Sequence, residues 1–387
     1  MEAYLDNAAT TPVLPEVTKI MQKVMEEDFG NPSSRHTKGF DAEKYIRETA
    51  DIISAQLKCA PKEIIFTSGG TEANNQALIG TAIANRRVGK HVITTAIEHA
   101  SVYKPMEYLE EMGYEVSYLP VDEKGQLSID ILKEAMREDT FLVSVMYVNN
   151  EIGSVQRIEE IGRFLKKNHP NVLFHVDAIQ AFGKYKIVPG KSGIDFMSVS
   201  AHKMHGPKGI GFLYASSDRK LRPILFGGGQ QRGLRSGTEN VPGIAGLGVA
   251  VKCAYEEHPA KIEKLFRLRK QFCDAIVKVE DVVIHGPGGA ETEGTAPHIV
   301  SVGFAGIKSE VLLHALAERG VYVSSGSACS SNHPELSGTL KAIGVKKEFL
   351  DSTLRFSFSM LTTEEEVDYA IREVGELLPK LRRFTRH

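Results

Sequence analysis

The sequence predicts a doubly wound α/β fold, in which helices cover both faces of a mainly parallel sheet. Up to about Val241, apolar strand-like segments alternate with segments of helical period. The strand-like segments are rich in β-branched residues and lack polar alternation, as expected for strands buried on both faces. Beyond Val241, long helical stretches and short strands predict a second, smaller unit.

Seven segments are predicted to form the strands of the main sheet: residues 63–67, 91–95, 115–119, 141–146, 172–177, 194–200 and 209–214. Between several of them, the helical period predicts helices at residues 71–87, 102–112 and 158–168.

In the second unit a helical stretch is expected from residue 241 to about residue 279. Strands are then expected near residues 282–285, 299–304, 321–324 and 353–358. The last helix, residues 364–383, carries an apolar stripe on one face, so we expect it to pack against the rest of the chain.

The composition is that of a globular protein, with 42% hydrophobic and 25% charged residues among 387. A net charge of −2 gives no reason to expect nucleic acid or an anionic membrane as a partner. No apolar run approaches a membrane span, and the first residues lack the pattern of a signal peptide. The cysteines Cys59, Cys253, Cys273 and Cys329 are far apart, which suggests neither a disulfide framework nor a zinc site. We expect a reducing, cytoplasmic environment.

Lys203 follows the predicted strand 194–200, and Asp177 ends the predicted strand before it. A lysine amine that leaves water becomes nucleophilic enough to form a Schiff base with a carbonyl. An isolated lysine at a strand end more often points into solvent. The Schiff-base interpretation is favoured by Asp177, because a protonated pyridine nitrogen needs a carboxylate partner.

Other polar residues follow neighbouring predicted strands. Gly70 and Thr71 open a helix whose N-terminus could bind phosphate, although a simple helix cap is an equal alternative. His99 could stack on a planar cofactor or cap the next helix, and the amides of Asn149 and Asn150 could bind a carboxylate or a phenolate. All these residues fall at the carboxyl ends of strands, the edge at which open α/β sheets bind ligands.

Eight motifs together resemble the NifS/IscS family of cysteine desulfurases: residues 4–11, 30–34, 68–75, 149–153, 175–180, 200–203, 235–240 and 324–331. The resemblance implies a pyridoxal-phosphate (PLP) transferase of fold type I. It implies a large domain with a seven-stranded, mainly parallel sheet (residues 15–255), and a smaller α+β domain (residues 1–14 and 256–387). It also implies a homodimer with active sites near the subunit interface.

By the same resemblance, Lys203 forms the Schiff base with PLP and moves a proton at the substrate Cα, and Asp177 binds the pyridine nitrogen. His99 stacks on the ring and transfers protons, and Gln180 binds the phenolic oxygen. The implied phosphate ligands are Gly70, Thr71, Ser200, His202 and, from the partner subunit, Thr238. Asn149 and Arg355 are implied to bind the substrate carboxylate, for which the planar guanidinium fork is suited.

Cys329 decides the reaction that the resemblance implies. Its serine- and glycine-rich surroundings predict an exposed, mobile loop. There the thiolate would take the sulfur of L-cysteine as a persulfide and leave L-alanine. The implied acceptor of that sulfur is an iron–sulfur scaffold or a tRNA-thiolating enzyme. The other three cysteines lie in apolar, helix-like patterns and are expected to be inert.

Two alternatives are open at this point. A selenocysteine lyase or an aminotransferase would share the fold, although a transaminase has no use for a thiol on a flexible loop. A zinc protein using His202 and His205, or a non-enzymatic sulfur scaffold, belongs to a different class. No third zinc ligand has a recognisable spacing to these two histidines.

Overall fold

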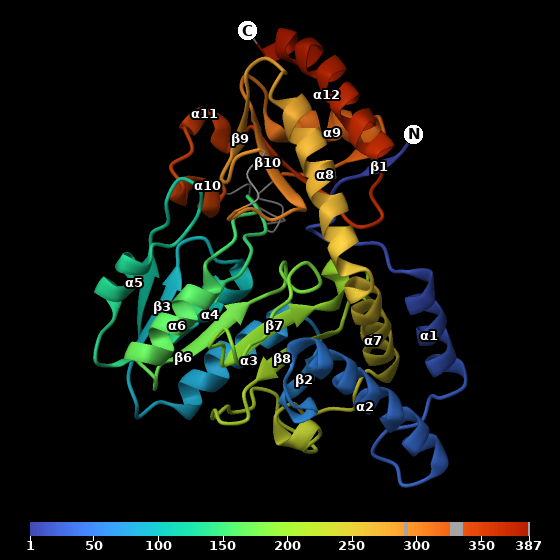
Figure 1. Ribbon diagram of the computed structural model, residues 1–387, viewed down its shortest axis with the longest axis vertical. Coiled ribbons are helices and arrows are strands. Elements are labelled where there is room, and N and C mark those ends of the chain that lie inside the picture. The colour runs from blue at the N-terminus through green and yellow to red at the C-terminus, as the bar shows by residue number, and fades with distance from the viewer. Residues whose placement is uncertain (290–292, 326–335, 386–387) are drawn as a thin grey trace.

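The computed structural model describes residues 1–289, 293–325 and 336–385 of the chain. Its lower part in Figure 1 contains a large sheet with helices on both faces, and its upper part contains a smaller sheet. The helix α8 (His258–Ile276) leads from the lower part to the upper. No helix within these described residues combines the length and the apolar character needed to cross a membrane.

The large sheet has seven strands in the order β2-β8-β7-β6-β5-β3-β4. Its strands are β2 (Ile64–Thr67), β3 (His91–Thr95), β4 (Glu115–Leu119), β5 (Thr140–Met146), β6 (Leu173–Asp177), β7 (Phe196–Ser200) and β8 (Gly211–Ala215). β8 runs antiparallel to both β2 and β7, and every other pair is parallel. The predicted seven-stranded, mainly parallel sheet is therefore confirmed.

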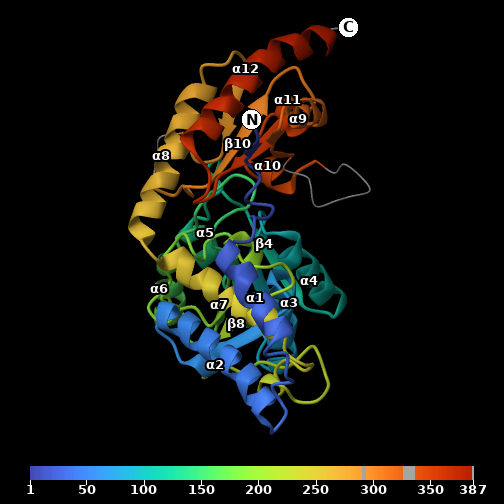
Figure 2. The same cartoon turned by 90° about the vertical axis from the view of Figure 1, so that its right-hand side faces the viewer.

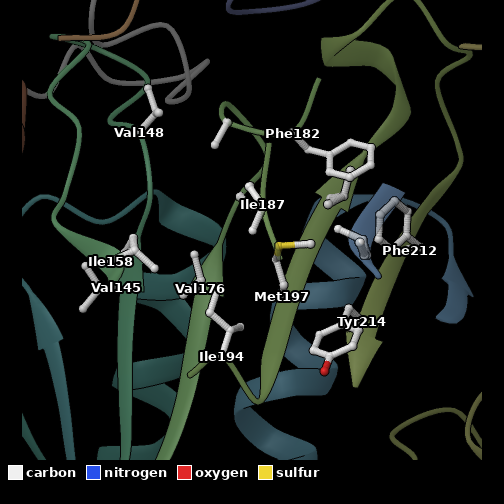
Figure 3. Close-up of a cluster of buried hydrophobic side chains, with 14 of the residues drawn as sticks. Val145, Val148, Ile158, Val176, Phe182, Ile187, Ile194, Met197, Phe212 and Tyr214 are labelled. Carbon is white, nitrogen blue, oxygen red and sulfur yellow. The ribbon is translucent and has the colours of Figure 1, made fainter. Parts of the chain in front are cut away.

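Helices cover both faces of this sheet. One core cluster joins the strands to α2 (Thr37–Leu57), α6 (Ile158–Asn168) and α7 (Val241–Tyr255), and Figure 3 shows part of it. A second cluster joins the opposite face to α3 (Gly70–Ala84) and α4 (Ala100–Glu111).

The strand sequences explain why both faces are covered. In β5, Val143 and Val145 belong to the first cluster, while Leu142 belongs to the second. Every residue of β5 is buried, so the strand has no polar face to leave in water. Each such side chain contributes about 1.5–3 kcal/mol of transfer free energy.

The upper sheet is antiparallel, in the order β12-β13-β10-β9. Its strands are β12 (Ser324–Ser325), β13 (Thr353–Ser357), β10 (Ile299–Phe304) and β9 (Val282–His285). Residues of α8, α9 (Ser309–Glu318) and α12 (Glu364–Thr385) form its core together with the apolar strand residues. The N-terminal strand β1 (Ala3–Tyr4) pairs with β11 (Val321–Tyr322) and joins this core. The predicted domain boundaries stay a prediction.

The remaining helices are α1 (Pro15–Glu26), α5 (Ile129–Ala135), α10 (Gly338–Ala342) and α11 (Lys347–Leu350). α1 and α2 both contact α7, and Figure 2 shows the three helices side by side.

Two predicted elements are divided in the structure. The expected helical stretch from residue 241 to 279 is broken between α7 and α8, where Glu257 is left-handed with φ of 48° and Pro259 lies in the first turn of the next helix. Proline suits the first turn of a helix, because the N–H that it lacks would have no partner within the helix there. The expected strand 321–324 is two short strands that pair with different partners, β1 and β13.

Candidate active site

A cavity of about 290 Å³ lies at the carboxyl ends of β5, β6 and β7. Arg355 of β13 and Ala8 and Ala9 of the N-terminal segment also line it, so both sheets contribute to its wall. The lining residues that the sequence also predicts as site residues are Gly70, Thr71, His99, Asp177, Gln180, Ser200, His202, Lys203 and Arg355.

Lys203 ends a short 3₁₀ helix, Ala201–Lys203, which follows β7 directly. Its Nζ donates hydrogen bonds to the carbonyl oxygens of Ala8 and Ala9, each over 2.7 Å. Its own carbonyl oxygen accepts a hydrogen bond of 2.7 Å from Nζ of Lys184. The amine is thus held against the cavity wall by two carbonyl oxygens, and the residue is partly buried.

Asp177 ends β6 and is only 4% exposed. Its Oδ1 accepts a hydrogen bond from the backbone N–H of Ile179, and its Oδ2 accepts one of 2.8 Å from Nδ2 of Asn74. Burial raises the pKa of this carboxyl group, while the two hydrogen bonds and the nearby His99 oppose the rise. A positively charged N–H in the cavity would favour the carboxylate further.

His99 caps α4 and is connected to Asp177 through two side chains. Its Nδ1 accepts from the backbone N–H of Ser101 over 3.1 Å and lies 2.8 Å from Oγ of Ser101. Nδ2 of Asn74 donates to that Oγ as well as to Asp177. Burial lowers the pKa of His99, with Asp177 acting in the opposite direction. The neutral ring therefore carries its proton on Nε2, because Nδ1 is an acceptor.

The N-terminus of α3 forms another part of the cavity wall. Gly69 has a φ of 153° and a ψ of −173°, a conformation essentially restricted to glycine, and it turns the chain from β2 into the helix. A Cβ atom on Gly70 would overlap the side chain of Ile179. The packing of Ile179 therefore requires glycine at residue 70, and the helix N-terminus at Gly70 and Thr71 favours an anion.

His202 directly precedes Lys203 in the chain, and its imidazole ring is neutral. Burial, together with the neighbouring lysine charges, lowers its pKa to about 4. Its Nδ1 lies 3.2 Å from Oγ1 of Thr10. His205, the second histidine of the zinc alternative, has Nδ1 within 2.8 Å of the carbonyl oxygen of Pro12. Among the residues that the structure describes, no three His, Cys, Asp or Glu side chains form a group that could hold a metal ion.

Arg355 enters the cavity from β13, and its side chain is 7% exposed. Its Nη1 donates to the carbonyl oxygen of Asn150 and its Nη2 to Oδ1 of Asp6, each over 2.9 Å. No residue in the described part of the chain accepts a hydrogen bond from its buried Nε. The guanidinium is thus oriented by two partners and retains donors for a carboxylate.

Three predicted site residues are not brought to this cavity. Asn149 is fully buried beneath it: its Nδ2 donates to the carbonyl oxygen of Ile97, and its Oδ1 accepts from the backbone N–H groups of Glu151 and Ile152. Its neighbour Asn150 lines the cavity instead. Thr238 is exposed and lies outside the cavity of its own chain. Cys329 lies outside the described residues.

The three described cysteines are poor nucleophiles. Burial raises the pKa of the Cys59 thiol to about 12, and it also raises the pKa values of Cys253 and Cys273. Because the thiolate is the reactive form, these residues are protonated and unreactive at neutral pH.

Several residues of the site have no local signal in the sequence. Asp6, Ala8 and Ala9 reach Arg355 and Lys203 from the other end of the chain. Asn74 and Ser101 connect Asp177 with His99, although nothing in their spacing indicates that connection. Only the motifs at residues 4–11 and 68–75 could have pointed to Asp6, Ala8, Ala9 and Asn74.

Comparisons with known proteins agree with this geometry. Residues 3–370 match the family described as Aminotransferase class-V. The chain is 43% identical over 382 residues to the cysteine desulfurase IscS of Methanosarcina thermophila, with 99% of this chain and 93% of the relative covered. Among solved structures, a NifS-like protein has a TM-score of 0.92 at 37% identity, with 98% of this chain and 100% of the other covered.

A further solved structure, described as SspA in complex with cysteine, has a TM-score of 0.80 at 34% identity and covers 93% of this chain and 100% of its own. The chain belongs to the class-V aminotransferase family and, within it, to the cysteine desulfurases of the NifS/IscS type. The predicted family is therefore confirmed.

Proposed function

We propose that this protein is a PLP-dependent cysteine desulfurase, which converts L-cysteine into L-alanine and passes the sulfur to an acceptor protein. The observation that carries the proposal is the placement of the Lys203 amine and the buried Asp177 carboxylate in the wall of one cavity. Family membership and the similar protein in complex with cysteine support L-cysteine as the substrate.

The residues present fit PLP in their chemistry. The N-terminus of α3 at Gly70 and Thr71, with Ser200 and His202, would hold the phosphate. Lys203 would provide the anchoring amine, and Asp177 would accept a hydrogen bond from the ring nitrogen. When bound, PLP supplies an aldehyde for amines and a ring that withdraws electrons from the substrate Cα.

The protein residues then divide the remaining tasks. Asp177 holds the proton on the ring nitrogen, and the Asn74–Ser101 connection fixes His99 with its proton on Nε2. Nζ of Lys203 moves a proton at the substrate Cα, for which a positioned acid–base group contributes about 10²–10⁴-fold in rate. Arg355, oriented by Asp6 and Asn150, binds the substrate carboxylate.

The sulfur step is assigned to Cys329. Its thiolate forms a bond with the substrate sulfur while the bond between that sulfur and Cβ breaks, so that one thiol and L-cysteine give one persulfide and L-alanine. The other cysteines do not suit this step, because their raised pKa values leave them as thiols. An aminotransferase needs no such thiol.

Assembly and destination belong to the same proposal. We infer a cytoplasmic homodimer in which Thr238 reaches the phosphate in the partner's cavity, in keeping with its exposure on the single chain. The sulfur would go to an iron–sulfur scaffold or a tRNA-thiolating enzyme. Neither nucleic acid nor a membrane is proposed as a direct partner.

The deciding experiment is Cys329→Ala with Cys59→Ala as its matched control. Cys329→Ala should still bind PLP and L-cysteine, because the cavity residues are untouched, but it should release no sulfide and no persulfide. Mass spectrometry of the wild type after turnover should find one added sulfur on the peptide that contains Cys329. Normal desulfurase activity in Cys329→Ala, or the added sulfur on another cysteine, contradicts the assignment.

A further inference from the structure

A second, smaller cavity of about 40 Å³ lies next to the large one. Lys203 lines both cavities. Ala8 and Ala9 line the large cavity, whereas Asn7 and Thr11 of the same segment line the small one. The small cavity and the proposed PLP site therefore share Lys203 and neighbouring residues of the N-terminal segment.

One hydrogen bond connects a residue of the large cavity with a residue of the small one. Gln180 lines the large cavity, His298 lines the small one, and Nε2 of His298 lies 3.4 Å from Oε1 of Gln180. Nε2 of Gln180 donates to the carbonyl oxygen of Ala8 over 2.9 Å. Because that carbonyl can only accept, the amide of Gln180 must point its oxygen toward His298.

This orientation decides which nitrogen of His298 carries the proton. The ring is 1% exposed, and burial together with nearby lysine and arginine charges lowers its pKa well below the ordinary value, so it is neutral. Nε2 must be the donor, since it faces the oxygen of Gln180. Nδ1 is then a bare acceptor.

Two residues that line the small cavity each carry a buried acceptor. Neither Nδ1 of His298 nor Oδ1 of Asn7 receives a hydrogen bond from any residue in the described part of the chain. The orientation of the Asn7 amide is fixed, because its Nδ2 donates to the carbonyl oxygens of Tyr4 and Ser357. Asn7 is 4% exposed, so leaving both acceptors unpaired would cost about 1–3 kcal/mol for each.

One bound water molecule would provide hydrogen bonds for both acceptors. It has two protons for the two acceptors, and it can accept a hydrogen bond from Lys184, which also lines the cavity and already donates to Lys203. Buried waters typically make about three hydrogen bonds. A cavity needs about 10–15 Å³ to hold one water molecule, and this cavity provides about 40 Å³.

We propose that His298 is a positioning residue of the active site: with one water molecule bound to Asn7, it holds the amide of Gln180 so that the second N–H of that amide points into the large cavity. This inference rests on the proposed function, because the group that receives this N–H is the phenolic oxygen of PLP. His298 acts only through Gln180 and touches neither the cofactor nor the substrate.

The readout is the pH titration of the absorbance of bound PLP, which requires no turnover. An N–H donor stabilises the negative charge on the phenolic oxygen, so its loss should raise the titration midpoint. One hydrogen bond corresponds to a shift of about half to one pH unit. His298→Asn removes the donor near Gln180 and should show this upward shift.

Two further variants serve as controls. His298→Gln places an amide N–H near the position of Nε2 and should return the midpoint to within a few tenths of a pH unit of the wild type. His285→Asn replaces a buried histidine of β9 that lines neither cavity and should leave the midpoint unchanged. A wild-type midpoint in His298→Asn, or an equal shift in His285→Asn, overturns the proposal.

A crystal structure of the holoenzyme tests the water directly. A water molecule within hydrogen-bonding distance of Nδ1 of His298 and Oδ1 of Asn7 supports the proposal, and a protein donor paired with either atom overturns it. Failure of the proposed function gives a different result: the wild type would then yield no L-alanine from L-cysteine, or no absorbance to titrate.

Discussion

The buried carboxyl group of Glu98 should make the free energy of unfolding depend on pH, and the size of that dependence follows from the structure. The residue lies between β3 and the cavity residue His99. Its Oε1 accepts from Oγ1 of Thr95 over 2.7 Å and from the backbone N–H of Met146 over 2.9 Å. Its Oε2 is buried, with no partner among the described residues. Burial raises the pKa of this carboxyl group from 4.5 to about 8.

A raised pKa makes the folded protein less stable as the pH rises. Below pH 4.5, both the folded and the unfolded chain hold the proton, and Glu98 contributes no pH dependence. Between pH 4.5 and about 8 the unfolded chain releases the proton while the folded chain keeps it. At about 1.4 kcal/mol for each pH unit, the free energy of unfolding falls by about 3 kcal/mol at pH 7.

Glu98→Gln should remove this loss. The amide oxygen keeps both hydrogen bonds of Oε1, and the side chain is neutral at every pH. The variant should therefore match the wild type near pH 4.5 and exceed its free energy of unfolding by up to about 3 kcal/mol at pH 7. Urea titrations of both proteins at several pH values measure the difference.

The matched control is Glu48→Gln on α2, where the carboxylate is 55% exposed and lies 3.7 Å from Lys44. Its effect should stay within about 0.5 kcal/mol at all pH values. A difference between Glu98→Gln and the wild type that does not change with pH would refute the reasoning, since the titration of a buried carboxyl group would then not be its cause.

Three further predictions concern the cavity. Lys203→Ala should abolish L-alanine formation and the absorbance of covalently held PLP while leaving the circular dichroism unchanged, and unchanged turnover would remove the Schiff-base assignment. Arg355→Lys should raise KM for L-cysteine by about 10–100-fold with little change in PLP absorbance, because a lysine cannot contact Asp6 and Asn150 and also bind a carboxylate. An unaltered KM would argue against binding of the substrate carboxylate by Arg355. Thr238→Ala should weaken PLP retention during dialysis, and a wild-type monomer with full PLP occupancy at micromolar concentration would contradict the shared site.

The local pattern predicted the main elements well because each is decided by nearby residues. β3 and β4 have the predicted bounds, and α6 matches as well, since apolar residues at helical spacing bury one of its faces. Pattern alone could not place the break between α7 and α8, because Glu257 is left-handed within an otherwise helical sequence.

The site was less accessible to prediction because its contacts are long-range. Lys203 and Ala8 are 195 positions apart, and Arg355 and Asp6 are 349 apart. Hydrophobic periodicity describes neighbouring residues and cannot indicate contacts between residues so far apart in the sequence. Asn149 and Asn150 show a second limit: they are identical neighbours, and only the turn closed by the Asn149 side chain decides that Asn150 faces the cavity.

The N-terminal segment of residues 6–11 explains how the two sheets hold one site. Asp6 orients Arg355 of the upper sheet, and the carbonyl oxygens of Ala8 and Ala9 orient Lys203 of the lower sheet. Thr11 donates to the carbonyl oxygen of His202, and so ties the segment to the same 3₁₀ turn. The proposed substrate clamp and the proposed anchoring amine therefore share one support, so a displacement of this segment would disturb substrate binding and the position of the amine together.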